Sequence, residues 1–109
     1  MTPDRARDLL AGERARIEHE LRDLAPAAGG NDADTGDEAA ALTDAERGEQ
    51  AAEDLRGQLA AVERAEQRLA DGAYGLSVES GDPIPDGRLE ALPAAERTVE
   101  EQARFDGGA

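Results

Sequence analysis

The sequence predicts a mainly α-helical protein, an antiparallel coiled-coil hairpin followed by a small turn-rich knot. Two segments repeat apolar residues at helical spacing, and a Pro-, Gly- and Asp-rich stretch over residues 26–39 separates them. After Gly72 the helical spacing stops, and Gly and Pro recur. We therefore expect a hairpin over residues 1–71 and a compact C-terminal region over residues 72–109 that ends in a short helix.

The first helix is expected over about residues 3–25. Thr2 is a good N-cap residue, Pro3 suits the first helical position, and Asp4 lies near the positive end of the helix dipole. Pro26 is expected to end this helix. The apolar seam before it has the spacing of a coiled coil and consists of Leu10, Ile17, Leu21 and Leu24.

The second helix is expected over about residues 40–71, after an acidic tip over residues 26–39. It should begin between Asp37 and Thr43, where Thr43 and Glu46 form a possible capping box, and end before Gly72. Its seam faces that of the first helix, although a coiled coil between two chains would use the same residues. The seam consists of Ala45, Gly48, Ala52, Leu55, Leu59, Val62, Glu66 and Leu69.

The C-terminal region carries most of the remaining large apolar residues. We expect structural roles for Tyr74, Ile84, Leu89 and Phe105, with Tyr74 and Phe105 as core anchors. Arg88 is expected to bond carbonyls or an acid within this region. A second capping box, with Thr98 at its start, predicts a final helix that runs to about Phe105.

Composition excludes several classes of function. With 26 acidic and 12 basic residues and a net charge of -14, the chain would be repelled by nucleic acid phosphates. It has no cysteine, and its single His19 is not paired with a nucleophile, so we expect neither an enzyme nor a cofactor. No apolar run approaches the ~20 residues of a membrane span, and a secretion signal is lacking. A cytoplasmic protein is expected.

The turn between the helices is acidic from Asp32 to Glu38 and contains no base. A calcium loop that starts at Asp32 is excluded, because its sixth position would be Asp37 in place of Gly and its twelfth Thr43 in place of Glu. The residues alone favour an ordinary solvated loop at the end of a hairpin.

The run from Ala73 to Pro93, followed by Thr98-x-x-Glu101, resembles the zinc-finger region of the DksA/TraR family of bacterial RNA polymerase regulators. The resemblance places Ser77, Ser80, Thr98 and Glu101 where the family has its four cysteine ligands. Hydroxyls are poor zinc ligands, and one carboxylate cannot supply four donors, so we predict that no zinc binds. Instead, Thr98 and Glu101 should cap the last helix reciprocally, and Ser77 and Ser80 should close a turn.

The resemblance extends to the acidic turn. The family carries D-x-x-D-x-A at the tip of its hairpin, and Asp34, Asp37 and Ala39 match this pattern. It implies a monomer that binds RNA polymerase without binding DNA. Its hairpin would enter the secondary channel, so that Asp34 and Asp37 approach the catalytic region, with Ala39 allowing close approach.

A second class of function stays open. The chain would keep the fold but not the regulation of polymerase, and would serve as a small acidic protein-interaction or assembly module, for example as a dimer. The loss of all four cysteines makes this alternative plausible.

Overall fold

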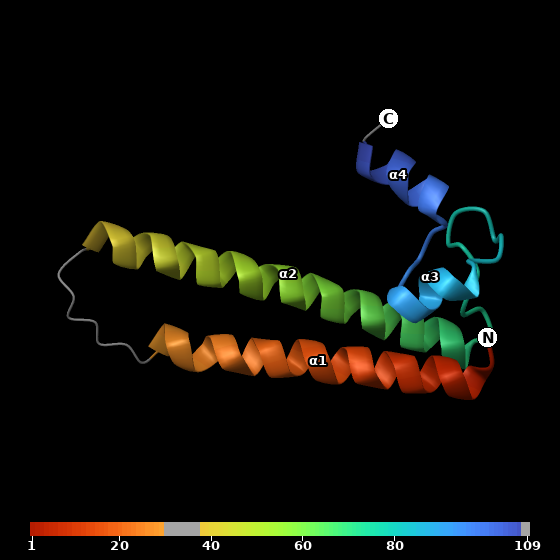
Figure 1. The fold of residues 1–109 in the computed structure, drawn as a ribbon, viewed down its shortest axis with the longest axis horizontal. Helices are drawn as coiled ribbons and strands as arrows, with labels where there is room; N and C mark the ends of the chain where they lie inside the picture. The colour runs from red at the N-terminus through yellow and green to blue at the C-terminus, as the bar shows by residue number, and fades with distance from the viewer. Residues whose placement is uncertain (30–37, 108–109) are drawn as a thin grey trace. The chain divides into compact units, whose positions relative to one another are not determined.

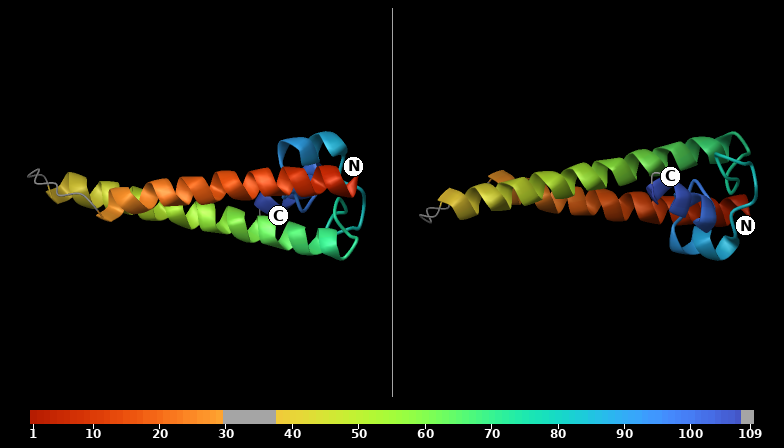
Figure 2. Two further views of the ribbon diagram at one scale, coloured as in Figure 1. Left: turned by 90° about the horizontal axis from the view of Figure 1, so that it is seen from below. Right: turned by 90° about the horizontal axis from the view of Figure 1, so that it is seen from above.

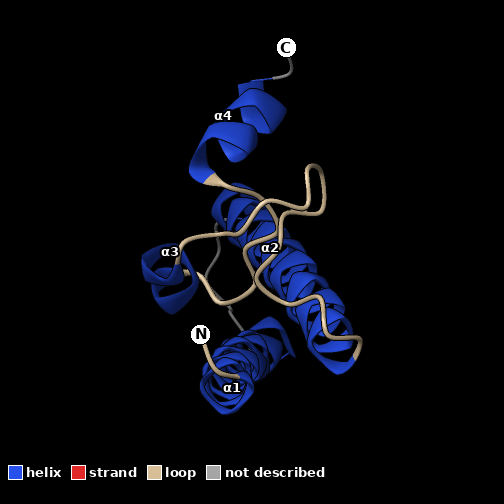
Figure 3. Cartoon of the chain, turned by 90° about the vertical axis from the view of Figure 1, so that its right-hand side faces the viewer, coloured by secondary structure: helices blue, strands red, loops and turns tan. Residues whose placement is uncertain are grey.

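The computed structural model describes the backbone of residues 1–29 and 38–107, and the side chains of residues 1–24 and 45–107. Within these ranges the chain forms four helices in succession, α1 (Pro3–Gly29), α2 (Glu38–Ala70), α3 (Asp86–Ala91) and α4 (Val99–Gly107) (Figure 1). Figure 3 draws no strand in the described ranges, and their β-structure is one isolated bridge between Leu76 and Pro83. The prediction of a mainly α-helical fold is confirmed.

The chain divides into two compact units. One unit comprises Met1–Glu13 and Ala61–Ala109, and the other comprises Arg14–Ala60. In each unit a part of α1 lies alongside a part of α2 and runs in the opposite direction, as both views of Figure 2 show. The predicted antiparallel helical hairpin is therefore present.

The ends of the two long helices differ in part from the prediction. α1 continues through Pro26 to Gly29, so the expected end before Pro26 was wrong. The helix thus includes Pro26, although a proline inside a helix lacks the N–H donor and crowds the carbonyl four residues before it. α2 begins at Glu38, inside the predicted interval but ahead of the capping box at Thr43. It ends at Ala70, and Gly72 follows with a φ of 81°, a conformation that suits glycine.

The predicted seams match burial along most of the described hairpin, except at Ala45, which is exposed. Leu10 and Ile17 of α1 and Leu55 and Val62 of α2 are buried. Leu21 and Leu24, nearer the turn, are half-buried. Ala6 and Ala65 are also buried, although the seams did not include them. Alanine is common on both faces of these helices, so its presence at one position carries little information about burial.

The C-terminal region has a small apolar core. Ile84, Leu89 and Ala95 form a buried cluster, against which Tyr74 packs. The Tyr74 hydroxyl donates a hydrogen bond to the Pro93 carbonyl at 2.8 Å. Leu89 belongs to α3, a helix that the sequence did not predict because Pro85 and Gly87 favour a turn.

Phe105 is not a core anchor, contrary to expectation. It is 59% exposed, and the Arg97 guanidinium lies 3.8 Å from the centroid of its ring. α4 buries one residue, Glu101, so the helix contributes no apolar side chain to the core. Leu76, Val78 and Leu92 are exposed as well. The apolar core of this region is therefore smaller than its composition suggested.

Ion pairs connect the C-terminal region to the long helices within the same unit. Arg64 of α2 donates two hydrogen bonds to the Glu96 carboxylate, at 2.9 and 3.0 Å, and Arg68 adds a third at 3.3 Å. Arg5 of α1 donates two to Glu90, at 3.0 and 2.6 Å. The hydrogen bonds from Arg64 lower the pKa of Glu96, and those from Arg5 lower the pKa of Glu90. These arginine–glutamate pairs thus attach the C-terminal region to α1 and α2, where few apolar side chains are buried.

Leu89→Ala should destabilise the C-terminal region by about 2–5 kcal/mol, because it leaves a cavity in a cluster that cannot readily collapse. Tyr74 is the one Tyr of a chain without Trp, so tyrosine fluorescence during urea unfolding reports on this region. Leu92→Ala is the matched control, since Leu92 is 43% exposed and its loss should cost less than about 0.5 kcal/mol. Equal effects of the two substitutions would contradict the assigned core.

Candidate functional site

Two regions were expected to carry function, the acidic tip and the C-terminal knuckle, by which we mean Ser77–Ser80 together with Thr98–Glu101. Asp34 and Asp37 lie outside the described residues. Ala39 lies in the first turn of α2, where the backbone alone is described. The structure describes the backbone and side chains of every residue of the knuckle.

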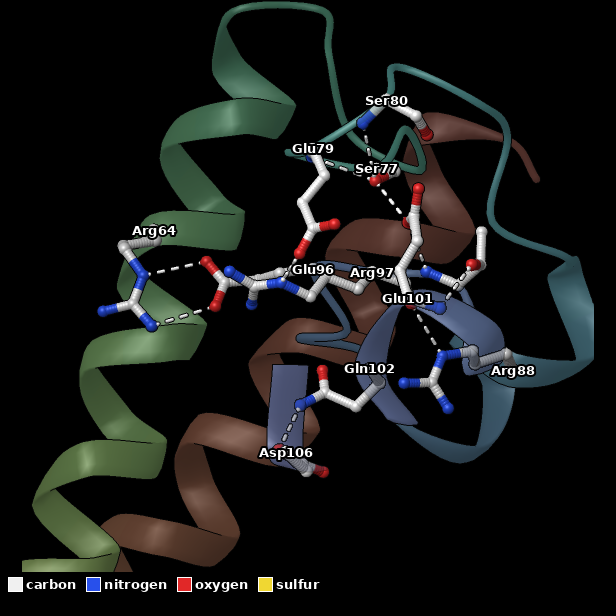
Figure 4. Close-up of polar contacts among 11 residues, drawn as sticks. Arg64, Ser77, Glu79, Ser80, Arg88, Glu96, Arg97, Glu101, Gln102 and Asp106 are labelled. Atoms are coloured by element: carbon white, nitrogen blue, oxygen red, sulfur yellow. Dashed lines mark hydrogen bonds and ion pairs between the residues drawn. The ribbon is translucent and has the colours of Figure 1, made fainter. Parts of the chain in front are cut away.

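The knuckle brings together its four predicted positions from two separate stretches of chain, and Figure 4 labels Ser77, Ser80 and Glu101 of these. Thr98 precedes α4, and Glu101 lies in the first turn of that helix. The Thr98 amide donates to Glu101 Oε1 at 3.0 Å, and the Glu101 amide donates to Thr98 Oγ1 at 3.2 Å. The predicted reciprocal capping is therefore confirmed.

Ser77 and Ser80 close a tight turn. Ser77 Oγ accepts hydrogen bonds from the amides of Glu79, at 3.0 Å, and Ser80, at 3.2 Å. Ser80 Oγ accepts one from the Asp82 amide at 3.2 Å. Gly81 completes the turn with a φ of 77° and donates its amide to the Ser77 carbonyl at 3.0 Å. The predicted local side-chain to backbone bonds are present.

The contact that links the two stretches was not predicted. The Ser77 hydroxyl donates a hydrogen bond to Glu101 Oε1 at 2.6 Å, and the two residues are 5% and 6% exposed. The sequence assigned each residue to its own local motif. One signal pointed to their contact, because four positions that hold one metal ion in a family must converge in space.

The buried Glu101 carboxylate is kept ionised by its donors. Hydrogen bonds from the Ser77 and Ser80 hydroxyls and from the Thr98 amide lower the pKa of Glu101 from 4.5 to about 2. A charge-assisted hydrogen bond is shorter and stronger than a neutral one, which agrees with the 2.6 Å contact to Ser77.

The segment from Ala95 to Thr98 connects the knuckle to its surroundings. The Glu96 carbonyl accepts a hydrogen bond from the Val78 amide at 2.9 Å, and the Arg97 carbonyl accepts one from Arg88 Nε at 2.9 Å. Arg97 Nε in turn donates to Glu79 at 2.6 Å. Arg88 thus bonds a carbonyl, and the segment contacts both the serine turn and α3.

The described residues hold no group of three or more His, Cys, Asp and Glu side chains able to bind a metal ion. None of the helices, as far as they are described, is long and apolar enough to span a membrane. The chemistry of the knuckle is that of hydrogen-bond donors gathered around one carboxylate.

Comparisons with known proteins show the family to which the chain belongs. No family model matches it. The solved structure of transcription factor DksA2 from Pseudomonas aeruginosa superposes with a TM-score of 0.72 at 33% sequence identity, covering 97% of this chain and 84% of that one. The chain belongs to the DksA family. Its fold and its hairpin are therefore those of the family.

Two curated relatives match this chain over only part of their own length. General stress protein 16O of Bacillus subtilis is 36% identical over 94 residues, which are 86% of this chain and 58% of the relative. The RNA polymerase-binding transcription factor DksA of Caulobacter vibrioides is 37% identical over 76 residues, which are 70% and 54%. The chain spans a little over half the length of these two relatives.

The zinc that the resemblance to DksA zinc fingers implies does not fit the residues of this knuckle. The family positions hold three hydroxyls and one carboxylate. One oxygen of this carboxylate, Oε1, already accepts hydrogen bonds from Ser77 and Thr98, so a cation bound to that oxygen would have to displace these donors. The donor set is suited to an anion.

Protein purified without a metal-affinity tag should contain far less than one zinc per chain, because the knuckle offers no thiolate. Elemental analysis measures the content, and EDTA should leave the tyrosine-monitored unfolding midpoint unchanged. Refolding with excess zinc serves as the control and should not raise the midpoint. Stoichiometric zinc, or unfolding by EDTA, would contradict the assignment.

Acid should remove the contribution of Glu101 to stability. The unfolded chain protonates this group near 4.5 and the folded chain near 2, so the contribution is complete above pH 4.5 and is lost as the pH falls towards 2. Glu101→Gln lacks the charge at every pH. The difference in melting temperature between wild type and this variant should therefore shrink between pH 5 and pH 2, whereas parallel pH profiles would contradict the assigned ionisation.

Proposed function

We propose that this DksA-family protein binds RNA polymerase directly and regulates transcription by inserting its hairpin into the secondary channel. The observation that carries the proposal is the likeness to transcription factor DksA2, which covers 97% of the chain, both hairpin helices and the knuckle included. The Caulobacter relative, whose name states that it binds RNA polymerase, supports the same partner.

The proposed active element is the acidic turn, with Asp34 and Asp37 as the charges that approach the catalytic region of the polymerase. Carboxylates there would attract basic side chains of the channel or alter the field around the catalytic magnesium ions. Ala39 would allow close approach. A net charge of -14 speaks against direct contact with DNA and for a basic protein surface.

Such a mechanism requires an arm that holds its tip in place. In the unit Arg14–Ala60, the apolar Ile17 and Leu55 are buried, and Arg16 of α1 donates a hydrogen bond to Gln58 of α2 at 3.1 Å. In the other unit, the ion pairs of Glu90 and Glu96 hold the knuckle region to the helices. These contacts support an arm that works without zinc.

The binding itself is tested by a pull-down with the core RNA polymerase of the same organism, in the presence and absence of a known secondary-channel factor. The protein should be retained at micromolar concentration and displaced by the competitor. Absence of binding would favour the alternative, an acidic interaction or assembly module, and size-exclusion chromatography would then show whether it is a dimer.

Asp34→Asn combined with Asp37→Asn should abolish the effect on transcription in vitro and change the affinity for polymerase less than about threefold, because the tip acts on the catalytic region and the rest of the protein binds. The matched control is Glu46→Gln with Glu49→Gln, two exposed acids of α2, which removes the same charge. Loss of affinity together with activity would mean that the tip only docks. An equal loss in the control would mean that net charge is responsible.

A further inference from the structure

We propose that the unit Arg14–Ala60 opens and closes as one element while the rest of the chain stays folded. We call it the hairpin unit, and we call the unit of Met1–Glu13 with Ala61–Ala109 the knuckle unit. Three features of the hairpin unit carry the proposal, namely sparse apolar burial, an excess of acidic residues and a glycine that packing does not require. The opening is a property of the chain alone.

Apolar burial is sparse in the hairpin unit. Of its described side chains, the buried hydrophobic ones are Ile17 and Leu55. Residues 25–44, whose side chains are not described, contain Leu42 as their one large apolar residue. The described part of the knuckle unit buries seven hydrophobic residues. Because opening exposes buried apolar surface to water, the hairpin unit should open at a lower free energy than the knuckle unit.

The hairpin unit also carries an excess of acidic residues. Residues 14–60 contain twelve Asp and Glu residues against five Arg. Three of these acids, Glu46, Glu49 and Glu53, are exposed and lie three or four positions apart on α2. Like charges at this spacing on a helix repel each other, and an open chain holds them farther apart. Salt, which screens exposed charges, should therefore favour the closed hairpin.

Gly57 lowers the stability of the closed hairpin further. It lies within α2 and is exposed, and a Cβ atom added to it would meet no neighbouring atom within 4 Å. Alanine would therefore fit at this position and would favour the helix, because glycine has more conformational freedom to lose. The chain thus keeps a residue that favours opening where packing allows a more stable one.

The charge of the hairpin unit also bears on binding, in a way that rests on the proposed function. The closed hairpin would be the form that presents the acidic turn to the polymerase. A basic surface on a partner protein would neutralise the excess of acid and so stabilise the closed form relative to the open one. Binding to such a surface would select the closed hairpin from the two forms.

Hydrogen exchange of the full-length protein, followed amide by amide by NMR, tests the opening. We compare the hairpin amides, of residues 17–24 and 50–59, with the knuckle amides, of residues 63–69 and Ile84. The hairpin amides should have similar protection factors, at least about tenfold below those of the knuckle amides, because one opening exposes them all. Raising sodium chloride from about 10 mM to about 100 mM should increase the protection of the hairpin amides, since the Debye length falls from about 30 Å to about 10 Å.

Two substitutions with effects of similar size show whether the opening is confined to the hairpin unit. Gly57→Ala should raise the protection factors of the hairpin amides about fivefold, because alanine favours the closed helix. Tyr74→Phe is the matched variant in the knuckle unit, where it removes the hydrogen bond to the Pro93 carbonyl. It should lower the protection factors of the knuckle amides about fivefold and leave those of the hairpin amides unchanged.

A chain that unfolds in a single step would give a different result. Tyr74→Phe would then lower the protection of the hairpin amides as much as that of the knuckle amides, and wild type would protect both groups equally. Either result overturns the inference, and so does unchanged protection of the hairpin amides in Gly57→Ala. These experiments contain no polymerase, so their failure would leave the proposed partner standing, and failure of the pull-down would leave the opening standing.

Discussion

A shortage of large apolar side chains governs how this protein is held together. Its C-terminal region has a buried cluster of Ile84, Leu89 and Ala95, with Tyr74 packed against it. Clusters of this size supply little of the free energy that opposes chain entropy. The remaining order of the region therefore depends on polar contacts with defined geometry, and the described structure contains them in two places.

The first place is the surface between the C-terminal region and the long helices of the same unit, where Arg64, Arg68 and Arg5 hold Glu96 and Glu90. Glu96 has 18% of its side chain exposed, so its pairs are partly shielded from solvent, whereas the Arg5 pair is about half exposed and correspondingly weaker. The second place is the knuckle, where Glu101 is buried and accepts directed hydrogen bonds from Ser77 and Thr98. The ion pairs thus attach the C-terminal region to the long helices, whereas the hydrogen bonds of the knuckle fix its local conformation.

The sequence predicted the features that depend on periodicity and local chemistry. Leu10, Ile17, Leu55 and Val62 were identified from helical spacing, and the reciprocal caps of Thr98 and Glu101 from a four-residue motif. It failed where distant residues decide the outcome. The Ser77 to Glu101 bond spans 24 residues, and α3 forms in a stretch whose Pro85 and Gly87 suggest a turn. Phe105 was misplaced because hydrophobicity alone does not show that Arg97 will stack on its ring at the surface.

The hydrogen bond from Ser77 to Glu101 also bears on the number of molecules that take part when the knuckle folds. A zinc finger closes in a step that involves a second species, so the folded fraction rises with the concentration of free metal. Glu101 is carried by the chain itself, and its effective concentration at the serine turn is fixed by the loop between them. Closure of the knuckle through this hydrogen bond is thus unimolecular, and its equilibrium constant contains no ligand concentration.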